Sequence, residues 1–145
     1  MEIKRLGTDD ILIAANILEN YRDSPDNVLP SKEHINRLLE NSTCYVIAAL
    51  ETDHPIGFAL AYSFPSFQIE ERIAYLYDIE VLPDHRNKGI GKQLINNLLM
   101  HLGKDGVKEI WLGTGVTNIP GQKLFTSTGA KKEEEIFFEY FYHLD

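Results

Sequence analysis

The sequence predicts an α/β protein with a mixed β-sheet, whose elements follow the order β-α-α-β-β-β-α-β-α-β. Apolar runs rich in β-branched and aromatic residues alternate with segments whose apolar residues recur at helical spacing. Two of these runs, 44–50 and 56–64, are separated by a short turn and so predict an antiparallel pair. A helix stands between the runs 74–82 and 109–114, which makes those two strands parallel.

In the first half of the chain, caps and turn residues separate the elements. Thr8 precedes two acidic residues and Ser31 follows Pro30, and a hydroxyl at such a position accepts hydrogen bonds from the first N–H groups of a helix. The run Ser24-Pro25-Asp26-Asn27 marks a loop between two helices, and Pro65 ends the third strand. We expect strands at 2–6, 44–50 and 56–64, and helices at 11–20 and 31–41.

The second half is divided in the same way. Pro83 ends a strand, because it has no N–H to donate to a ladder. Asn118 caps a helix in which Pro120 occupies a first-turn position, and Gly129 ends that helix. The last run is aromatic and apolar, as in a strand. We expect strands at 74–82, 109–114 and 134–144, and helices at 89–102 and 120–128.

Size and composition limit the location and the partners. We expect one domain over residues 1–145, because 43% hydrophobic and 25% charged residues are ordinary for a globular chain of this length. The chain has no apolar run of about 18 residues, and its start lacks the apolar core of a signal peptide. We therefore expect a cytoplasmic protein without a transmembrane helix. The net charge of −8 disfavours nucleic acid and anionic membranes; it suits a polycationic substrate, or serves solubility alone.

Cysteine and histidine give no catalytic or metal signature. Cys44 is the only cysteine, which excludes an internal disulfide, and its apolar surroundings favour a small buried side chain over a nucleophile. The five histidines lack ligand spacing, so we expect no metal site.

The junction between the expected strand 74–82 and the helix that follows it has the features of an anion site. It contains the sequence Arg86-Asn87-Lys88-Gly89-Ile90-Gly91-Lys92. The first N–H groups of a helix have no internal partner, and the helix dipole makes that end positive. Glycines let the backbone approach a bulky ligand, and three basic side chains add charge. A phosphate or pyrophosphate would fit here, although these residues could also form an ordinary turn before a helix.

The pattern R-x-x-G-x-G, after a strand ending in V-x-P and before an amphipathic helix, resembles the acetyl-CoA site of the GCN5-related N-acetyltransferases (GNAT). The order of elements is similar over nearly the whole chain, and so is the run N-x-x-G-x-x-L-F-T-S-T-G-A from Asn118. The resemblance implies the GNAT fold, with helices on both faces of a mixed central sheet. The stretches LPSKEHINRLLENST and LYDIEV and the final aromatic run look most like small aminoglycoside 3-N-acetyltransferases.

The resemblance also implies roles for residues at the donor site. Strand positions Ile79 and Val81 would hold the pantetheine arm of acetyl-CoA, and the Val81 N–H would face the thioester carbonyl. Asn118, in the family's second motif, would also contact the cofactor. The pyrophosphate would be held by the loop residues Arg86, Asn87, Lys88, Gly89, Ile90, Gly91 and Lys92.

Direct acetyl transfer requires a deprotonated amine and a donor for the oxyanion, but no enzyme nucleophile. Asp78 and Glu80 would share one face of a regular strand, although a bulge would change that parity. Both are candidates for the base, and Asp78 is also a candidate contact for the acceptor. The plainer interpretations are that Asp78 is a structural, hydrogen-bonded carboxylate and that Glu80 is an exposed strand position. Tyr77 is a packing residue or part of the acceptor pocket. Asp23 and Asp26 lie in the loop that borders the acceptor cleft in the family.

The sequence departs from the family pattern where many relatives carry a tyrosine that protonates the departing thiolate. Phe125 cannot do so, which leaves water, another hydroxyl or release of the thiolate itself. Two functions follow: an N-acetyltransferase for a primary amine of a small cationic acceptor, aminoglycoside-like, or a catalytically weak CoA-binding sensor or interaction module. Polyamines, amino acids and peptide N-termini are alternative acceptors. We also expect a homodimer, because residues 136–142 carry aromatics on both strand faces.

Overall fold

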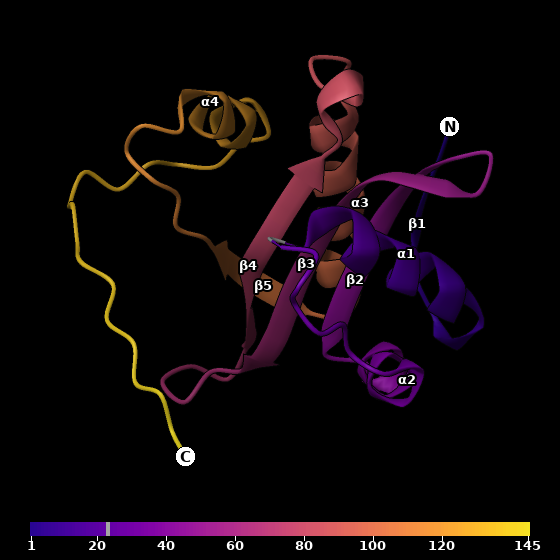
Figure 1. The fold of residues 1–145 in the computed structure, drawn as a ribbon. Helices are drawn as coiled ribbons and strands as arrows, with labels where there is room; N and C mark the ends of the chain where they lie inside the picture. The colour runs from indigo at the N-terminus through magenta and orange to yellow at the C-terminus, as the bar shows by residue number, and fades with distance from the viewer. Residues whose placement is uncertain (23) are drawn as a thin grey trace.

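A five-stranded sheet in the spatial order β1-β2-β3-β4-β5 forms the centre of the computed structural model, which describes residues 1–22 and 24–145 (Figure 1). The first four strands are antiparallel, and β5 is parallel to β4, so the predicted mixed α/β sheet is confirmed. The elements are β1 (Glu2–Arg5), η1 (Thr8–Asp10), α1 (Ile11–Tyr21), α2 (Lys32–Glu40), β2 (Cys44–Glu51), β3 (His54–Pro65), β4 (Arg72–Val81), η2 (Pro83–His85), α3 (Ile90–Lys104), β5 (Val107–Trp111) and α4 (Ile119–Ser127).

Helices cover both faces of the sheet. One face carries α3, whose Leu94, Leu98 and Leu102 are at most 1% exposed. The other face packs against α1 and α2 through residues that include Ile17 and Ile35. Because β2 lies between these two layers, the side chains on both of its faces are buried, which explains why its sequence is apolar without alternation.

The predicted final strand is wrong for the single chain. Residues 130–145 form neither a helix nor a strand, and Figure 1 shows them as an extended yellow trace outside the sheet. The large apolar side chains between Ile136 and Leu144 are 68% to 94% exposed. Aromatic composition favours strands, but a strand forms only where a neighbour accepts and donates its backbone hydrogen bonds. This segment has no such neighbour among the described residues.

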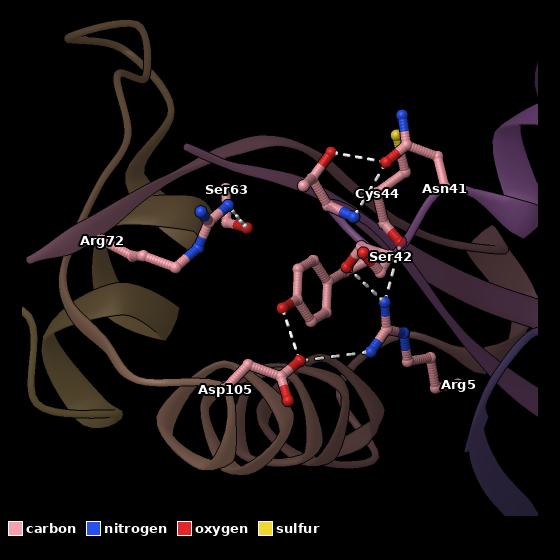
Figure 2. A network of polar contacts seen from close by, with 9 residues as sticks. Arg5, Asn41, Ser42, Cys44, Ser63, Arg72 and Asp105 are labelled. Carbon is pink, nitrogen blue, oxygen red and sulfur yellow. Dashed lines mark hydrogen bonds and ion pairs between the residues drawn. The ribbon is translucent and has the colours of Figure 1, made fainter. Parts of the chain in front are cut away.

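A polar network ties the C-terminal end of α3 to β1 and β2 (Figure 2). Tyr45 is 1% exposed and its hydroxyl donates to Asp105 Oδ2 at 2.6 Å. The Arg5 guanidinium lies 3.8 Å from the centre of the Tyr45 ring and donates to the carbonyl oxygens of Ser42 and Cys44, each at 3.1 Å. An Arg5–Asp105 ion pair of 3.5 Å completes the network. We call these residues the closed end of α3.

None of the described helices is both long enough and apolar enough to cross a bilayer.

Candidate active site

Strands β4 and β5 separate where β4 contains a bulge. The ladder between them ends at the pair Tyr75–Trp111. In the ladder with β3, Tyr77 is the extra residue of β4, because its two neighbours pair with consecutive residues of β3. A bulge bends a strand and increases its twist, so residues 77–81 keep β3 as a neighbour but leave β5. The separation exposes one backbone edge of β4.

The backbone of Ile79 and Val81 faces this gap. Leu82 donates its N–H to the Ile56 carbonyl on β3 at 2.9 Å. Alternate residues of an antiparallel strand turn their N–H and C=O groups to opposite sides, so those of Ile79 and Val81 point away from β3. The Val81 carbonyl accepts a hydrogen bond from Arg86 Nε at 2.9 Å. The Val81 N–H is thereby directed into the gap, where it could donate to a carbonyl or an oxyanion.

The loop from Arg86 to Lys92 places the start of α3 beside the gap. Asn87 and Gly89 have left-handed backbones, with φ of 60° and 81°. Gly89 is the N-cap of α3 and provides no side-chain acceptor for the first-turn N–H groups. A Cβ atom on Gly89 would have no atom within 4 Å, so there is space beside the positive end of the helix dipole. Arg86, Lys88 and Lys92 are exposed around it. This geometry fits a phosphate group.

Two other glycines near the site allow close packing. A Cβ on Gly91 would lie 3.1 Å from Leu124, so this glycine lets α4 approach α3. A Cβ on Gly57 would lie 3.0 Å from the Glu80 carbonyl oxygen and 3.3 Å from Leu94. Gly57 pairs with Val81 across the ladder, and its missing side chain keeps β3 and α3 close to the gap. We did not identify Gly57 from the sequence, because its neighbours lie far along the chain.

Asn118 has two internal partners that stabilise the start of α4. Its Oδ1 accepts from the Gly121 N–H at 3.1 Å, as predicted for an N-cap, and its Nδ2 donates to Thr114 Oγ1 at 2.9 Å. Phe125, also on α4, is partly buried against the core beneath α3. Both residues thus position α4 near the loop from Arg86 to Lys92.

The bulge determines which face carries the two strand carboxylates. Ahead of it, Ala74 and Leu76 pack in the core beneath α3; beyond it, Ile79 and Val81 do so. Asp78 and Glu80 therefore lie on the opposite face of the sheet. Their ladder partners on β3 are Leu60 and Phe58, which pack on that same face. Without the extra residue, both carboxylates would point into the apolar layer beneath α3.

The protonation of Glu80 responds to these surroundings. Burial raises the pKa of its carboxyl group and the charge of Asp78 raises it further, while Arg86 lowers it. A carboxyl group with a raised pKa is a better proton acceptor than an ordinary surface carboxylate. Glu80 directly precedes Val81 in β4, and the raised pKa makes it the stronger candidate of the two carboxylates for accepting a proton.

Tyr21, which sequence reasoning missed, covers the same region. Its ring lies 4.9 Å from that of Phe58, and its hydroxyl donates to the Ile56 carbonyl at 3.4 Å. Burial, and then the charge of Glu80, raise the pKa of Tyr21 to about 12, so the phenol stays neutral. Its spacing from Ala14 and Ile17, on one face of α1, was the signal that could have placed it against the sheet.

The predicted acceptor residues are less closely grouped. Tyr77, in the bulge, is 63% exposed. Asp26 is exposed in a turn closed by a hydrogen bond of 3.0 Å from the Asn27 N–H to the Ser24 carbonyl. Asp23 lies outside the described residues. Within the described part of the chain, no three side chains of the metal-ligating types gather as a metal site.

Comparison with known proteins identifies the family. The profile of the acetyltransferase (GNAT) family matches residues 12–130. The chain belongs to this family. It is therefore an N-acetyltransferase that uses acetyl-CoA, and the sequence resemblance to the GNAT family is confirmed. The GNAT fold expected from that resemblance is also confirmed, apart from its final strand.

Several relatives are similar over different lengths. The uncharacterized N-acetyltransferase YhfO of Bacillus subtilis is 26% identical over 136 residues, 92% of this chain and 91% of the relative. The [ribosomal protein bS18]-alanine N-acetyltransferase of Escherichia coli K12 is 32% identical over 73 residues, 50% of this chain and 48% of the relative.

Solved structures show the same fold. An aminoglycoside acetyltransferase, meta-AAC0020, from an uncultured soil metagenomic sample has a TM-score of 0.88 at 24% identity, over 99% of this chain and 96% of that chain. Structural neighbours of this GNAT protein thus include aminoglycoside acetyltransferases.

Proposed function

We propose that this GNAT enzyme transfers an acetyl group directly to a primary amine of a small cationic acceptor, with an aminoglycoside as the leading candidate. The observation that carries the proposal is that Asp78 and Glu80 share the face beside the Val81 N–H. Two carboxylates there would attract a positively charged amine and accept its proton. The net charge of −8 and the aminoglycoside acetyltransferases among the structural neighbours support the same acceptor class.

The donor site in this proposal has two parts. The edge of β4 at Ile79 and Val81 holds the pantetheine arm through backbone hydrogen bonds. The N–H groups and basic side chains from Arg86 to Lys92 hold the pyrophosphate. Asn118 contributes by capping α4, which packs over Gly91.

Glu80 removes a proton from the acceptor ammonium in the proposed reaction, and the amine lone pair then attacks the thioester carbonyl carbon. The Val81 N–H stabilises the resulting oxyanion, a contribution of about 3 kcal/mol in comparable sites. Collapse of the intermediate breaks the C–S bond and forms the amide. The amide nitrogen loses its remaining extra proton and the CoA thiolate leaves, protonated by water, since Phe125 has no hydroxyl.

A thiol-release assay tests the acceptor. We expect CoA release with acetyl-CoA and aminoglycosides, and weaker release with polyamines, amino acids and peptides. Turnover restricted to neutral or anionic amines would contradict a cationic acceptor. Tight CoA binding without turnover of any amine would favour the alternative of a CoA-binding sensor or interaction module, to which Phe125 points.

A peptide N-terminus is a second candidate acceptor. The observation in its favour is the similarity to the Escherichia coli enzyme named for the alanine of protein bS18. Peptides beginning with alanine belong in the same assay, and a kcat/KM for them above that for every aminoglycoside would make this the better assignment.

We further propose that the enzyme is a cytoplasmic homodimer. Acetyl-CoA, its donor, is an intracellular metabolite. The apolar side chains from Ile136 to Leu144 are exposed, and no described strand pairs with the outer edge of β5. The tail of a second copy could cover such surfaces. Sedimentation should therefore show a dimer, and a species of 16.6 kDa at every concentration would contradict it.

A further inference from the structure

Five aromatic side chains form a continuous cluster where β4 and β5 separate, which we call the aromatic shelf. Ring centres are 5.2 Å apart for Tyr75 and Trp111, and 6.1 Å apart for Tyr75 and Tyr77. Phe64 extends the shelf from Trp111 at 5.6 Å, and Tyr62 extends it from Tyr77 at 5.9 Å. These distances are typical of aromatic rings in contact.

The shelf lies on the same face of the sheet as the carboxylates of Asp78 and Glu80. Tyr62 and Tyr75 are partners in the ladder, and both point away from the core beneath α3, in which Ala61, Ala74 and Leu76 are buried. Beyond the bulge that face continues with Asp78 and Glu80. Large parts of the shelf reach solvent, since Tyr77 is 63% exposed and Trp111 is 44% exposed.

We infer that the aromatic shelf binds the part of the acceptor that does not react, and that it selects elongated, multiply charged amines with rings or methylene chains. Aromatic faces attract cations and stack against the C–H faces of sugar rings. At about 3.3 Å per residue, Tyr77 lies roughly 10 Å and Tyr75 roughly 16 Å along β4 from Glu80. An acceptor that extends from Glu80 as far as Tyr75 must therefore be larger than one amino acid or one sugar ring. This inference rests on the proposed function and adds a size and charge requirement to it.

The negative charges beside the aromatic shelf favour the acceptor, rather than the C-terminal tail of a second copy, as the molecule that binds there. The tail carries Glu133, Glu134 and Glu135 just before its aromatic residues and Glu139 among them. Placed on the shelf, these carboxylates would approach Asp78 and Glu80, and like charges repel. A polycationic amine would be attracted by the same two residues.

Trp111 allows a direct test, because it is the only tryptophan of the chain. We expect sisomicin, a polycationic aminoglycoside with several rings, to change its fluorescence saturably. Glucosamine, a single-ring amine, and trehalose, a neutral two-ring sugar, should bind at least about tenfold more weakly. Equal responses to all three, or no response, would overturn the inference. A fluorescence change that follows protein concentration instead would assign the shelf to a second copy.

The kinetics of Tyr77→Ala distinguish acceptor binding at the aromatic shelf from the chemical step. We expect the KM for sisomicin to rise about tenfold, more than kcat falls, while the KM for acetyl-CoA stays the same. Phe67→Ala is the matched control, because this aromatic residue is 103% exposed and lies outside the shelf. Thiol release with an unchanged acceptor KM in Tyr77→Ala would show that the aromatic shelf does not bind the acceptor, and would leave the proposed function standing. Absence of thiol release with every amine would instead contradict the proposed function.

Discussion

The two ends of α3 differ in how their polar groups are used. At the closed end, Asp105 accepts hydrogen bonds from Tyr45 and Arg5, and its own N–H bonds carbonyls of the last turn. At the other end, Gly89 caps the helix without a side-chain acceptor, and the surrounding basic residues are exposed. Internal contacts make the first end a stabilising element. We propose that the second end uses its N–H donors to bind the cofactor, so changes there should affect binding more than stability.

Gly89 and Gly106 provide a matched pair for the largest expected effect. Both have φ of 81°, and a Cβ on either would have no atom within 4 Å. Gly89→Asp should raise the Kd for acetyl-CoA at least about 100-fold, or about 2.7 kcal/mol, because it puts a negative charge where the pyrophosphate binds. Gly106→Asp should cost similar stability without changing the Kd. Calorimetry on folded proteins measures both, and equal affinities would refute the proposed donor site.

Gly91→Asp, in the same loop, is a less clean test than Gly89→Asp. Its side chain would meet Leu124 and displace α4, so lost binding could reflect packing alone.

Removing Asp105 tests the closed end. Asp105→Ala leaves the buried Tyr45 hydroxyl and the Arg5 guanidinium without their shared acceptor, and should lower the free energy of unfolding by about 2 kcal/mol. Acetyl-CoA affinity should stay within about twofold of the wild type. Urea denaturation measures the stability, with Lys104→Ala as an exposed control on the same helix end. A stable Asp105→Ala variant with weakened cofactor binding would reverse the assignment of the two ends.

The proposed proton transfer predicts a kinetic effect at the two carboxylates of β4. Glu80→Gln should lower kcat/KM by more than about tenfold, or about 1.4 kcal/mol, because glutamine cannot accept the proton. The wild-type rate should rise with pH as Glu80 ionises, and this limb should vanish in the variant. Asp78→Asn should act mainly on the acceptor KM. Losses below tenfold in both variants would make the two carboxylates structural.

The raised pKa of Glu80 also predicts that replacing this residue by glutamine gives a small gain in stability as pH rises. The folded-state pKa of Glu80 is raised above its ordinary 4.5, so its stabilising contribution is complete below that value and is lost as pH rises through the folded pKa. Glu80→Gln should thus become more stable than the wild type on going from pH 4 to pH 7, by less than about 1 kcal/mol because the partly exposed group is screened. Thermal unfolding at both pH values measures this; a constant difference would argue against the raised pKa.

Local signals were sufficient for the parts of the site that depend on neighbouring residues. Pro83, Gly89 and the apolar spacing of 89–102 predicted the strand end, the loop and α3, because caps and helical faces are set within a few residues. Likewise Asn118 was expected as a cap and is one.

Pairing between distant segments decided the rest. The position of the extra residue at Tyr77 depends on the register with β3, since every residue around it suits a strand equally well. That register alone turns Asp78 and Glu80 out of the core and opens the gap at Val81. For the same reason the aromatic tail was wrongly predicted to be a strand. Its composition favours a strand, but a strand also requires the edge of a neighbouring strand. Such an edge would have to come from a distant part of the chain or from another copy.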